Sequence, residues 1–388
     1  GINVPIAIVA FIVIALYCPS LKHAKKPRVD YRGAALLTVA LATLVLAVDN
    51  TEKIFAGLLE NTGMSLTMLR VIMGAIVAVS VWAFIHVERR AAEPILPLHF
   101  FTNSNFTKII GIAGLFGAAF IGSILYLTQF NQQVFGATPT ESGLMLLPMI
   151  GGLMFTSIGG GQIISRTGRY KLFMQIGIVL ATTMVFALTS LTPEASYLQE
   201  AIIILLLGMG LGVVMPVINL AVQNEFSQKE LGVATSSSQL FRSLGSTIGV
   251  AIFGAMLTMG ITTSLGDDIQ KDPYVQSLAQ NEQVKRIGSL TDSNTLLTLN
   301  TPDVKQMITT NFSKQVSTMP KPVQEKVKKD FLEAQNIYAS KVTHAFSDSL
   351  RVIFMTAGAL MSIGVVLVFS LKERPLKTGR ENDTPGLA

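Results

Sequence analysis

Polar side chains able to bind a ligand are few in this chain, and they lie inside long apolar runs. Gln239 and Arg242 stand three residues apart in the apolar run 233–260, and Asn219 and Gln223 stand four residues apart in the run before it. Residues three or four apart share one face of a helix. Polar groups on an apolar membrane helix face either a neighbouring helix or a water-filled cavity. These four side chains therefore predict either internal helix contacts or the wall of a binding cavity.

The sequence contains none of the common catalytic motifs. His-Glu-x-x-His, Gly-x-Ser-x-Gly and Walker patterns are absent, and no two carboxylates are paired inside an apolar run. A single cysteine, Cys18, excludes an intrachain disulfide and a cysteine metal cluster, and the four histidines are scattered. We therefore expect no enzyme activity, no metal site and no cofactor.

Acidic residues avoid the middle of the apolar runs. Those nearest to the runs all fall close to predicted helix ends, namely Asp49, Glu88, Glu141, Glu200, Glu225 and Asp348. A proton-coupled pump needs an ionisable group within the membrane whose protonation changes with access. We therefore expect the acid that would carry coupling protons to lie outside this chain.

The composition indicates a protein of the lipid bilayer. Half of the residues are hydrophobic, 14% are charged and the mean hydropathy is +0.51, well outside the range of water-soluble domains. The net charge is +6, but the Lys and Arg residues gather in a few loops and have no aromatic platforms beside them. This pattern is typical of membrane topology and argues against nucleic acid as a partner.

Nine apolar runs predict about nine membrane-spanning helices, of which the second is the weakest. The runs cover residues 4–17, 33–48, 66–87, 106–130, 140–164, 172–191, 198–223, 233–260 and 346–371. The segment 261–345 has nearly balanced charge and contains turn residues, so we expect a solvated insertion there. Beyond Pro322 its apolar residues keep helical spacing, which predicts an amphipathic helix leading into the last span. The insertion is either an external cap or partner surface, or a tolerated segment without a role.

Basic residues alternate between loops and set the predicted orientation. The rich loops hold the Lys and Arg residues of 22–32, 89–90, 166–171, 229 and 372–380. The intervening short loops hold only Lys53, with Arg70 near a helix end. The positive-inside rule places the rich set in the cytoplasm, so we expect a cytoplasmic C-terminus and an outer insertion. The chain starts at Gly1 without a signal-peptide pattern, and we expect that its natural beginning is missing.

Small residues recur at helical spacing on the seventh and eighth runs. Gly208, Gly212 and Pro216 lie four apart on the seventh run, and Gly245 and Gly249 lie four apart on the eighth. Lipid gives helices no hydrophobic reason to associate, so such bare faces let backbones approach closely. We expect these five positions to pack helices together or to border a cavity.

One short loop resembles a known family motif. Residues 161–171 read Gly-Gln-Ile-Ile-Ser-Arg-Thr-Gly-Arg-Tyr-Lys. This stretch resembles the second copy of the major facilitator loop motif, Gly-x-Leu-x-Asp-Arg-x-Gly-Arg-Arg/Lys, with Ser165 where the family often has Asp. The matching positions are Gly161, Arg166, Gly168, Arg169 and Lys171. The resemblance implies that the basic side chains latch cytoplasmic helix ends; the alternative is that they only follow the positive-inside rule.

Three further stretches resemble the fourteen-helix drug:proton antiporters of the same superfamily. Residues 126–148, with Gln132 and Leu147-Pro148, resemble the first hairpin of the C-terminal half of those proteins. Residues 232–251 resemble their penultimate helix, and residues 2–6 resemble the entry into their sixth helix. The motifs occur in the family's order and cover the chain apart from the insertion, so the chain is identified as a member of this group.

The resemblance implies an all-α, polytopic membrane fold in which the nine spans are helices six to fourteen. The first five helices, and the acids they carry in the family, would be absent. The implied segments are the last helix of the N-terminal bundle (1–18), two linker helices (19–104), the first five helices of the C-terminal bundle (105–260), the extracytoplasmic insertion (261–345), the last helix (346–371) and a cytoplasmic tail (372–388).

The resemblance also implies efflux of small lipophilic, often cationic compounds across the inner (cytoplasmic) membrane. Two bundles would rock around a site near the midplane, with the proton gradient as energy source and no cofactor. The missing N-terminal bundle would be the intramolecular partner, so we expect the chain alone to be inactive. The implied cavity residues are Gln129, Asn131, Gln132, Met145, Pro148, Asn219, Gln223, Gln239 and Arg242. The methionines Met145, Met149, Met209 and Met215 are either adaptable apolar lining of that cavity or ordinary core and lipid-facing residues.

Several alternatives stay open at this point. Arg242 either snorkels to the inner surface or pairs with backbone carbonyls or with an acid of the missing half. The substrate is a drug-like compound, or instead a siderophore, a lipid or an amino acid. A third alternative is a membrane scaffold or receptor that acts through the outer insertion.

Overall fold

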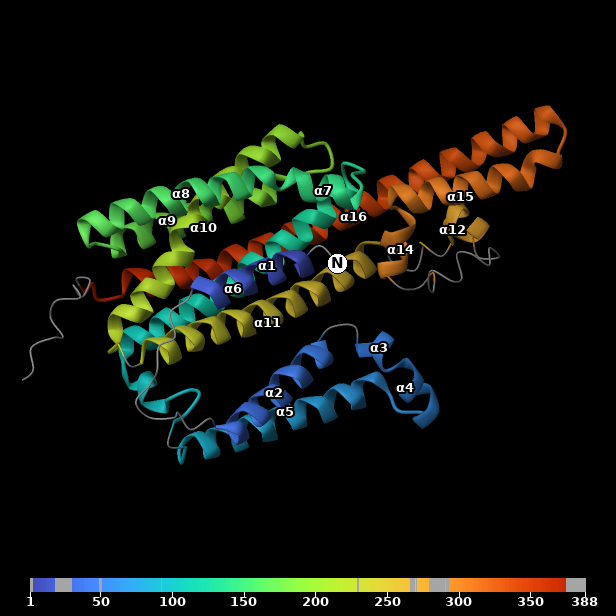
Figure 1. The fold of residues 1–388 in the computed structure, drawn as a ribbon. Coiled ribbons are helices and arrows are strands. Elements are labelled where there is room, and N and C mark those ends of the chain that lie inside the picture. Colours follow the sequence, from blue (N-terminus) through green and yellow to red (C-terminus); the bar gives the residue numbers. More distant parts are fainter. Residues whose placement is uncertain are drawn as a thin grey trace, which may run out of the picture.

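The computed structural model describes residues 3–17, 30–48, 51–91, 93–228, 230–265, 269, 271–278, 290 and 293–374. Every regular element among them is a helix (Figure 1). Eight of these helices are long and apolar enough to cross a membrane, which confirms the predicted all-α, polytopic fold. The first run, α1 (Asn3–Tyr17), has 15 residues, fewer than the ~20 that span the hydrocarbon core. Cys18, Lys229, the basic loop 22–28 and the tail beyond residue 374 lie outside the described residues.

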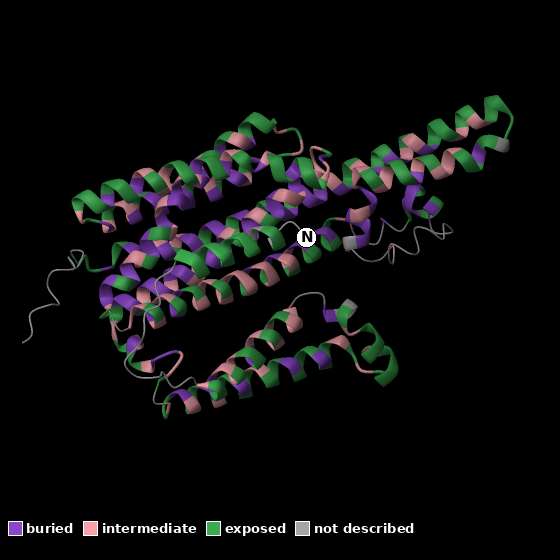
Figure 2. Ribbon diagram, viewed as in Figure 1, coloured by how far each residue is buried: buried purple, intermediate pink, exposed green. Residues whose placement is uncertain are grey.

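The chain from residue 104 onward forms a bundle of six membrane segments. They are α6 (Ser104–Gln133), the interrupted segment α7 (Pro139–Met145) with α8 (Leu147–Thr167), α9 (Lys171–Ala187), α10 (Tyr197–Glu225), α11 (Leu231–Leu265) and α16 (Lys321–Phe369). α10 packs against both α8 and α9, and α6 packs against both α11 and α16. α16 also contacts α9 and α11, which joins the two groups. Buried residues concentrate on the faces where these helices pack on one another, and exposed residues lie on the other faces (Figure 2).

Two ends of the bundle are distinguished by their loops. The basic end carries the α8–α9 loop with Arg166 and Arg169, and the residues that follow α16. The insertion end carries the α9–α10 connection with η2 (Leu188–Ser190), and the extension between α11 and α16. At the basic end, α8 closes with Gly168 in the left-handed conformation, φ +68°, which glycine adopts without strain. The second glycine of the loop motif, Gly168, therefore forms the turn between α8 and α9.

Close backbone contact holds the bundle together at small residues. A Cβ atom at Gly208 would overlap the Met149 carbonyl of α8, and one at Gly245 would overlap the Gly114 carbonyl of α6. Gly212 and Gly249 meet the neighbouring helix backbones in the same way. Small residues let membrane helices approach at the distance where dispersion forces act. These four glycines therefore lie at helix–helix contacts, whereas Pro216 is exposed.

A separate helix pair lies beside the bundle. α2 (Tyr31–Val48) and α5 (Leu66–Glu88) pack on each other and are connected through α3 (Thr51–Ile54) and α4 (Ala56–Thr62) (Figure 1). α2 also approaches α11. Large apolar side chains of α5, Val71, Val79 and Trp82 among them, are exposed, which suits contact with lipid. Beyond α5, η1 (Leu98–Thr102) leads the chain into α6.

The insertion is a folded extension of the bundle. α16 has 49 residues, so it is about 70 Å long and more than twice the thickness of the hydrocarbon core. The extension consists of the first half of α16 together with α12 (Pro273–Leu278), α14 (Ser293–Leu299) and α15 (Pro302–Gln315) (Figure 1). The short helix η4 (Val316–Thr318) precedes the turn into α16. Phe312 stacks on Phe331 at 3.9 Å, and Tyr274 lies 5.1 Å from Tyr338 between ring centres. The predicted amphipathic helix is present and continues unbroken into the last span.

The glycine contacts predict that two Gly→Ala substitutions change the unfolding free energy in opposite directions. Gly245→Ala should lower the unfolding free energy by about 1–3 kcal/mol, because the added methyl group overfills the α6–α11 contact. Gly151→Ala, on the exposed side of α8 with no atom near its Cβ position, should raise it by up to about 1 kcal/mol through helix propensity. Thermal unfolding in detergent, followed by size-exclusion chromatography, measures both. Equal midpoints for the two variants would contradict this packing account.

Candidate binding cavity and polar clusters of the bundle

A hollow of about 190 Å³ lies where α8, α10 and α11 meet. Its lining combines apolar and polar side chains, listed here along the chain: Leu153, Ser157, Gly212, Met215, Pro216, Ile218, Asn219, Ser238 and Arg242. Gly212 lets α10 approach α8 at the floor of the hollow, because a Cβ there would meet the Leu153 carbonyl. The same small residue that packs the helices thus also shapes the cavity.

Arg242 is the charged group of this hollow. Its Nη2 donates a 2.7 Å hydrogen bond to Oε1 of Gln239, one helical turn earlier, and its Nη1 lies 3.8 Å from the Met215 sulfur. Among the residues the structure describes, no carboxylate lies within ion-pair distance of the guanidinium. A guanidinium has five N–H donors, so Arg242 keeps donors free for another partner. The geometry places Arg242 on Gln239 and Met215 at the wall of the hollow.

The structure brings together only some of the predicted cavity residues. Asn219 lines the hollow with Arg242, and Gln239 holds Arg242 in place. Gln223 lies one turn beyond Asn219, and its Nε2 donates to Thr235 Oγ1 at 3.4 Å. Met215 lines the hollow as well. These predicted residues therefore lie together where α10 and α11 adjoin.

The other predicted residues lie toward the insertion end. Asn131 is fully buried, whereas Gln132 lines a separate cavity between the bundle and the insertion. Gln129 is half-buried, and Pro148 lies in the first turn of α8. The Met145 carbonyl accepts a hydrogen bond from the Tyr197 hydroxyl. The backbones of the remaining two methionines lie at the contact between α8 and α10, where Gly208 faces the Met149 carbonyl and Gly152 faces the Met209 amide.

The loop-motif residues lie at the basic end without a carboxylate partner. Arg166 and Arg169 are exposed, Gly161 is exposed on α8, and Lys171 begins α9. None of the three basic side chains forms an ion pair within the described part of the chain. Tyr170, between them, is buried, and burial raises the pKa of its phenol. The latch at this end of the bundle is built from other residues.

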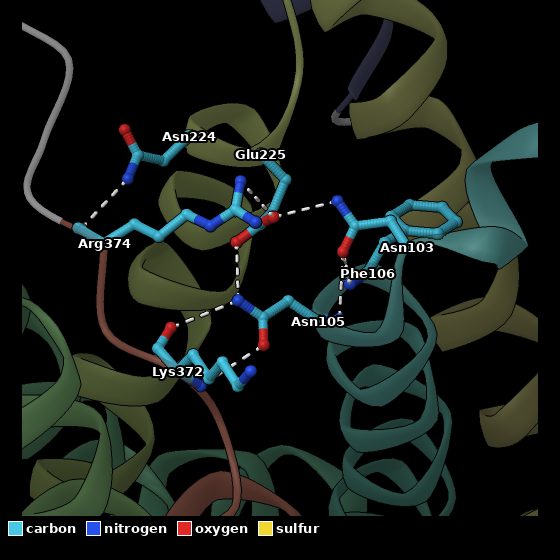
Figure 3. Close-up of polar contacts among 7 residues, drawn as sticks. All are labelled: Asn103, Asn105, Phe106, Asn224, Glu225, Lys372 and Arg374. Carbon is cyan, nitrogen blue, oxygen red and sulfur yellow. Dashed lines mark hydrogen bonds and ion pairs between the residues drawn. The ribbon is translucent and has the colours of Figure 1, made fainter.

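Glu225, the last residue of α10, is the centre of that latch (Figure 3). Its Oε2 accepts from Asn103 Nδ2 and its Oε1 accepts from Asn105 Nδ2, both at 2.9 Å. Arg374 Nη1 lies 3.2 Å from Oε2, and 1% of the Glu225 side chain is exposed. A buried carboxylate is stable when it is paired and hydrogen-bonded in this way.

The segment after α16 is held across two helix ends by the same cluster (Figure 3). Asn105 Nδ2 donates to the Lys372 carbonyl at 3.1 Å, and the Lys372 N–H donates to Asn105 Oδ1 at 3.2 Å. Asn224 Nδ2 donates to the Arg374 carbonyl at 3.1 Å. The start of α6, the end of α10 and the chain beyond α16 are thereby tied together. This latch could not be predicted from the sequence, because its three parts (103–105, 224–225 and 372–374) are more than 100 positions apart in the chain.

A second buried glutamate, Glu200, lies in the first turn of the same helix at the insertion end. It was expected near a helix end, and it is, but the bundle covers it completely. Neither carboxyl oxygen has a hydrogen-bond partner, and the buried side chain of Asn131 lies beside it. An ionised carboxylate without a partner costs several kcal/mol in such a place, and a helix N-terminus returns about 1 kcal/mol. The two ends of α10 therefore hold carboxyl groups in opposite environments.

The latch gives a stability prediction. Glu225→Ala should lower the unfolding free energy by about 2–3 kcal/mol, because two asparagine amides and Arg374 lose their acceptor. Glu373→Gln, an exposed acid of the same segment, should change it by less than about 0.5 kcal/mol. Thermal unfolding of the two variants side by side measures the difference. A Glu225→Ala protein as stable as Glu373→Gln would show that the latch contributes nothing.

Proteins similar to this chain include several that are named as transporters. Multidrug transporter protein MdtP of Bacillus subtilis is 29% identical over 387 residues, which are 98% of this chain and 65% of that protein. The uncharacterized MFS-type transporter Rv1877 of Mycobacterium tuberculosis is 29% identical over 375 residues, 97% of this chain and 47% of that protein. A tetracycline resistance determinant of Streptomyces rimosus is 23% identical over 362 residues, 92% of this chain and 95% of that protein. The chain thus spans about two thirds of the length of the first of these proteins and about half of the second.

The family comparison covers most of the membrane part of the chain. The model of the Major Facilitator Superfamily matches residues 1–250, from α1 into α11. That range contains the hollow, the loop motif and both glutamates of α10. It is a family of membrane transporters and not of enzymes, in agreement with the missing catalytic motifs. The chain belongs to the Major Facilitator Superfamily.

Proposed function

We propose that this chain forms the second bundle and the linker helices of a multidrug efflux permease. The observation that carries the proposal is the hollow around Arg242, a mixed apolar and polar wall on a bundle of this superfamily. Efflux of varied compounds agrees with the names of the similar proteins, which refer to multidrug transport and tetracycline resistance. Binding of chemically varied ligands suits a wall with few polar groups and a methionine.

The hollow gives each side chain a role in this proposal. Leu153, Met215 and Ile218 contact the apolar body of a substrate, whereas Asn219 and Ser238 offer hydrogen bonds. Arg242 repels a cationic substrate unless its charge is balanced. In the complete transporter an acid of the opposing bundle pairs with Arg242 when the cavity is closed, and the substrate competes for that acid when it opens.

The arrangement of the helices supports the fourteen-helix organisation. α2 and α5 form a pair of their own beside the bundle, as linker helices would. The segments are then the last helix of the first bundle (1–18), the linkers (19–104), the second bundle (105–260 and 346–371), the insertion (261–345) and the tail (372–388). An opposing bundle covers the hollow, and the protein lies in the cell membrane with the basic end in the cytoplasm. The proton gradient drives the cycle.

Two other functions compete with this proposal. An exporter of a siderophore, a lipid or an amino acid would use the same hollow, and a substrate screen separates these cases. A scaffold would act through the insertion, and the aromatic contacts of Tyr274, Phe331 and Tyr338 show that this part is folded. Deleting residues 272–318 in the complete protein separates the scaffold from the exporter, because efflux would persist only in the exporter.

The hollow gives a transport prediction for the complete protein. Arg242→Ala should reduce proton-dependent dye efflux by about tenfold, the loss expected when about 1.4 kcal/mol of site organisation is removed. Arg351→Ala, an exposed arginine of α16, serves as the charge-matched control and should leave efflux unchanged. Equal efflux by the two variants, at equal amounts in the membrane, would contradict the role given to the hollow. The 388-residue chain alone should give no efflux above empty membranes.

A further inference from the structure

One carboxyl group of the bundle has no role in the hollow or in the latch. Glu200 lies in the first turn of α10 and is completely buried. Its two oxygens have no hydrogen-bond partner, and both side-chain polar atoms of Asn131 on α6 are likewise buried and unpartnered. The two side chains lie beside each other, across the contact between α10 and α6. Two buried polar groups that face each other without other partners are suited to share a proton in a hydrogen bond.

The comparison with Glu225 on the same helix shows what Glu200 lacks. Glu225 is equally enclosed, but two asparagine amides and Arg374 surround its oxygens, which is the set of donors that an ionised carboxylate needs. Glu200 faces one neutral amide. A carboxyl group without a cation or donors is accommodated in the protonated form, which carries one O–H donor and needs one acceptor. The Asn131 Oδ1 atom is such an acceptor.

Charged groups from the surrounding elements do not compensate Glu200. Glu141 on α7 is exposed and caps its own helix at Thr138, and Glu194 before α10 is exposed and lies 3.5 Å from His344 of α16. On its own helix, the phenol of Tyr197 is the titratable neighbour, and its hydroxyl is bonded to the Met145 carbonyl. On the described parts of α8, α9 and α11, charged side chains lie at the basic end or in the hollow.

Asp348 and Arg351 of α16 point away from the packed interior. Both side chains are exposed, whereas Ser349 and Leu350 between them and Ser347 before them are buried. They are therefore on the outer face of α16 and provide no counter-charge inside the bundle. Within the described residues, no cation forms an ion pair with Glu200.

We propose that Glu200 and Asn131 form a proton-binding site of the second bundle, filled when the helices are closed as they are here. The Glu200 O–H donates to Asn131 Oδ1. When α6 and α10 separate at the insertion end, water reaches the carboxyl group, the O–H bond breaks with its electron pair left on the carboxylate, and the proton passes to that water. The role of this site in coupling proton release to transport rests on the proposed efflux function, whereas the presence of the bound proton does not.

Infrared spectroscopy of the 388-residue chain in lipid nanodiscs tests the bound proton directly. At neutral pH the wild-type chain should show a carboxylic-acid C=O band, with the small deuterium shift of a protonated carboxyl group, and Glu200→Gln should remove it. Glu225→Gln is the matched control and should leave that band in place, because Glu225 is surrounded by donors. Identical bands in the wild type and in Glu200→Gln would overturn the proposal.

A second variant keeps the test decisive if Glu200→Gln fails to fold. Asn131→Leu removes the acceptor and leaves the carboxyl group, so the band should persist and move to the higher frequency of a carboxyl group without a hydrogen bond. An unmoved band would overturn the pairing with Asn131. In the complete transporter, Glu200→Gln should reduce proton-driven efflux at least tenfold while substrate binding stays within twofold. Normal efflux in that variant, with the band present in the wild type, would overturn the coupling role alone. If the complete wild type gives no efflux at all, the proposed function fails and the infrared result stands.

Discussion

Helix contact through bare backbone is the constraint on which the rest of this bundle depends. In lipid, no hydrophobic effect draws helices together, so association relies on close packing and on satisfied polar groups. Gly208 and Gly212 bring α10 against α8, Gly210 brings it against α9, and Gly245 and Gly249 bring α11 against α6. α10 is therefore held on two sides at backbone distance. Everything placed on α10 inherits a fixed position relative to its neighbours.

The functional groups follow from this placement of α10. Its middle, with Met215 and Asn219, forms the wall of the hollow that Arg242 completes from α11. Its last residue, Glu225, accepts hydrogen bonds from two asparagine amides, pairs with Arg374 and ties the start of α6 to the chain after α16. Its first turn holds Glu200 without donors. From the insertion end to the basic end, this one helix thus carries a carboxyl group suited to a proton, a ligand wall and a charged latch.

Much of the fold could be predicted from the sequence, because long apolar runs and basic loops are local signals. The long helices from α6 to α11 overlap the apolar runs, and the amphipathic helix expected before the last span is the first half of α16, whereas the break between α7 and α8 and the helices α12, α14 and α15 had no such signal. The site was predictable only in part. Asn219, Gln239 and Arg242 share faces of neighbouring helices, and they meet. Asn131 and Gln132 are adjacent in the sequence, so they point about 100° apart on a helix, and the structure sends one into the core and the other to the insertion. The burial of Glu200 and the partners of Glu225 depend on residues far away in the chain, for which spacing carries no signal.

We infer that the wall formed by α10 and α11 faces the substrate in the complete transporter. Labelling of Asn219→Cys by a water-soluble maleimide, after Cys18→Ser removes the native thiol, tests this inference. We expect a transported dye to slow labelling at Asn219→Cys and to leave labelling unchanged at Gln162→Cys, an exposed position of α8 at the basic end. Labelling of Asn219→Cys at the same rate with and without saturating dye would contradict it.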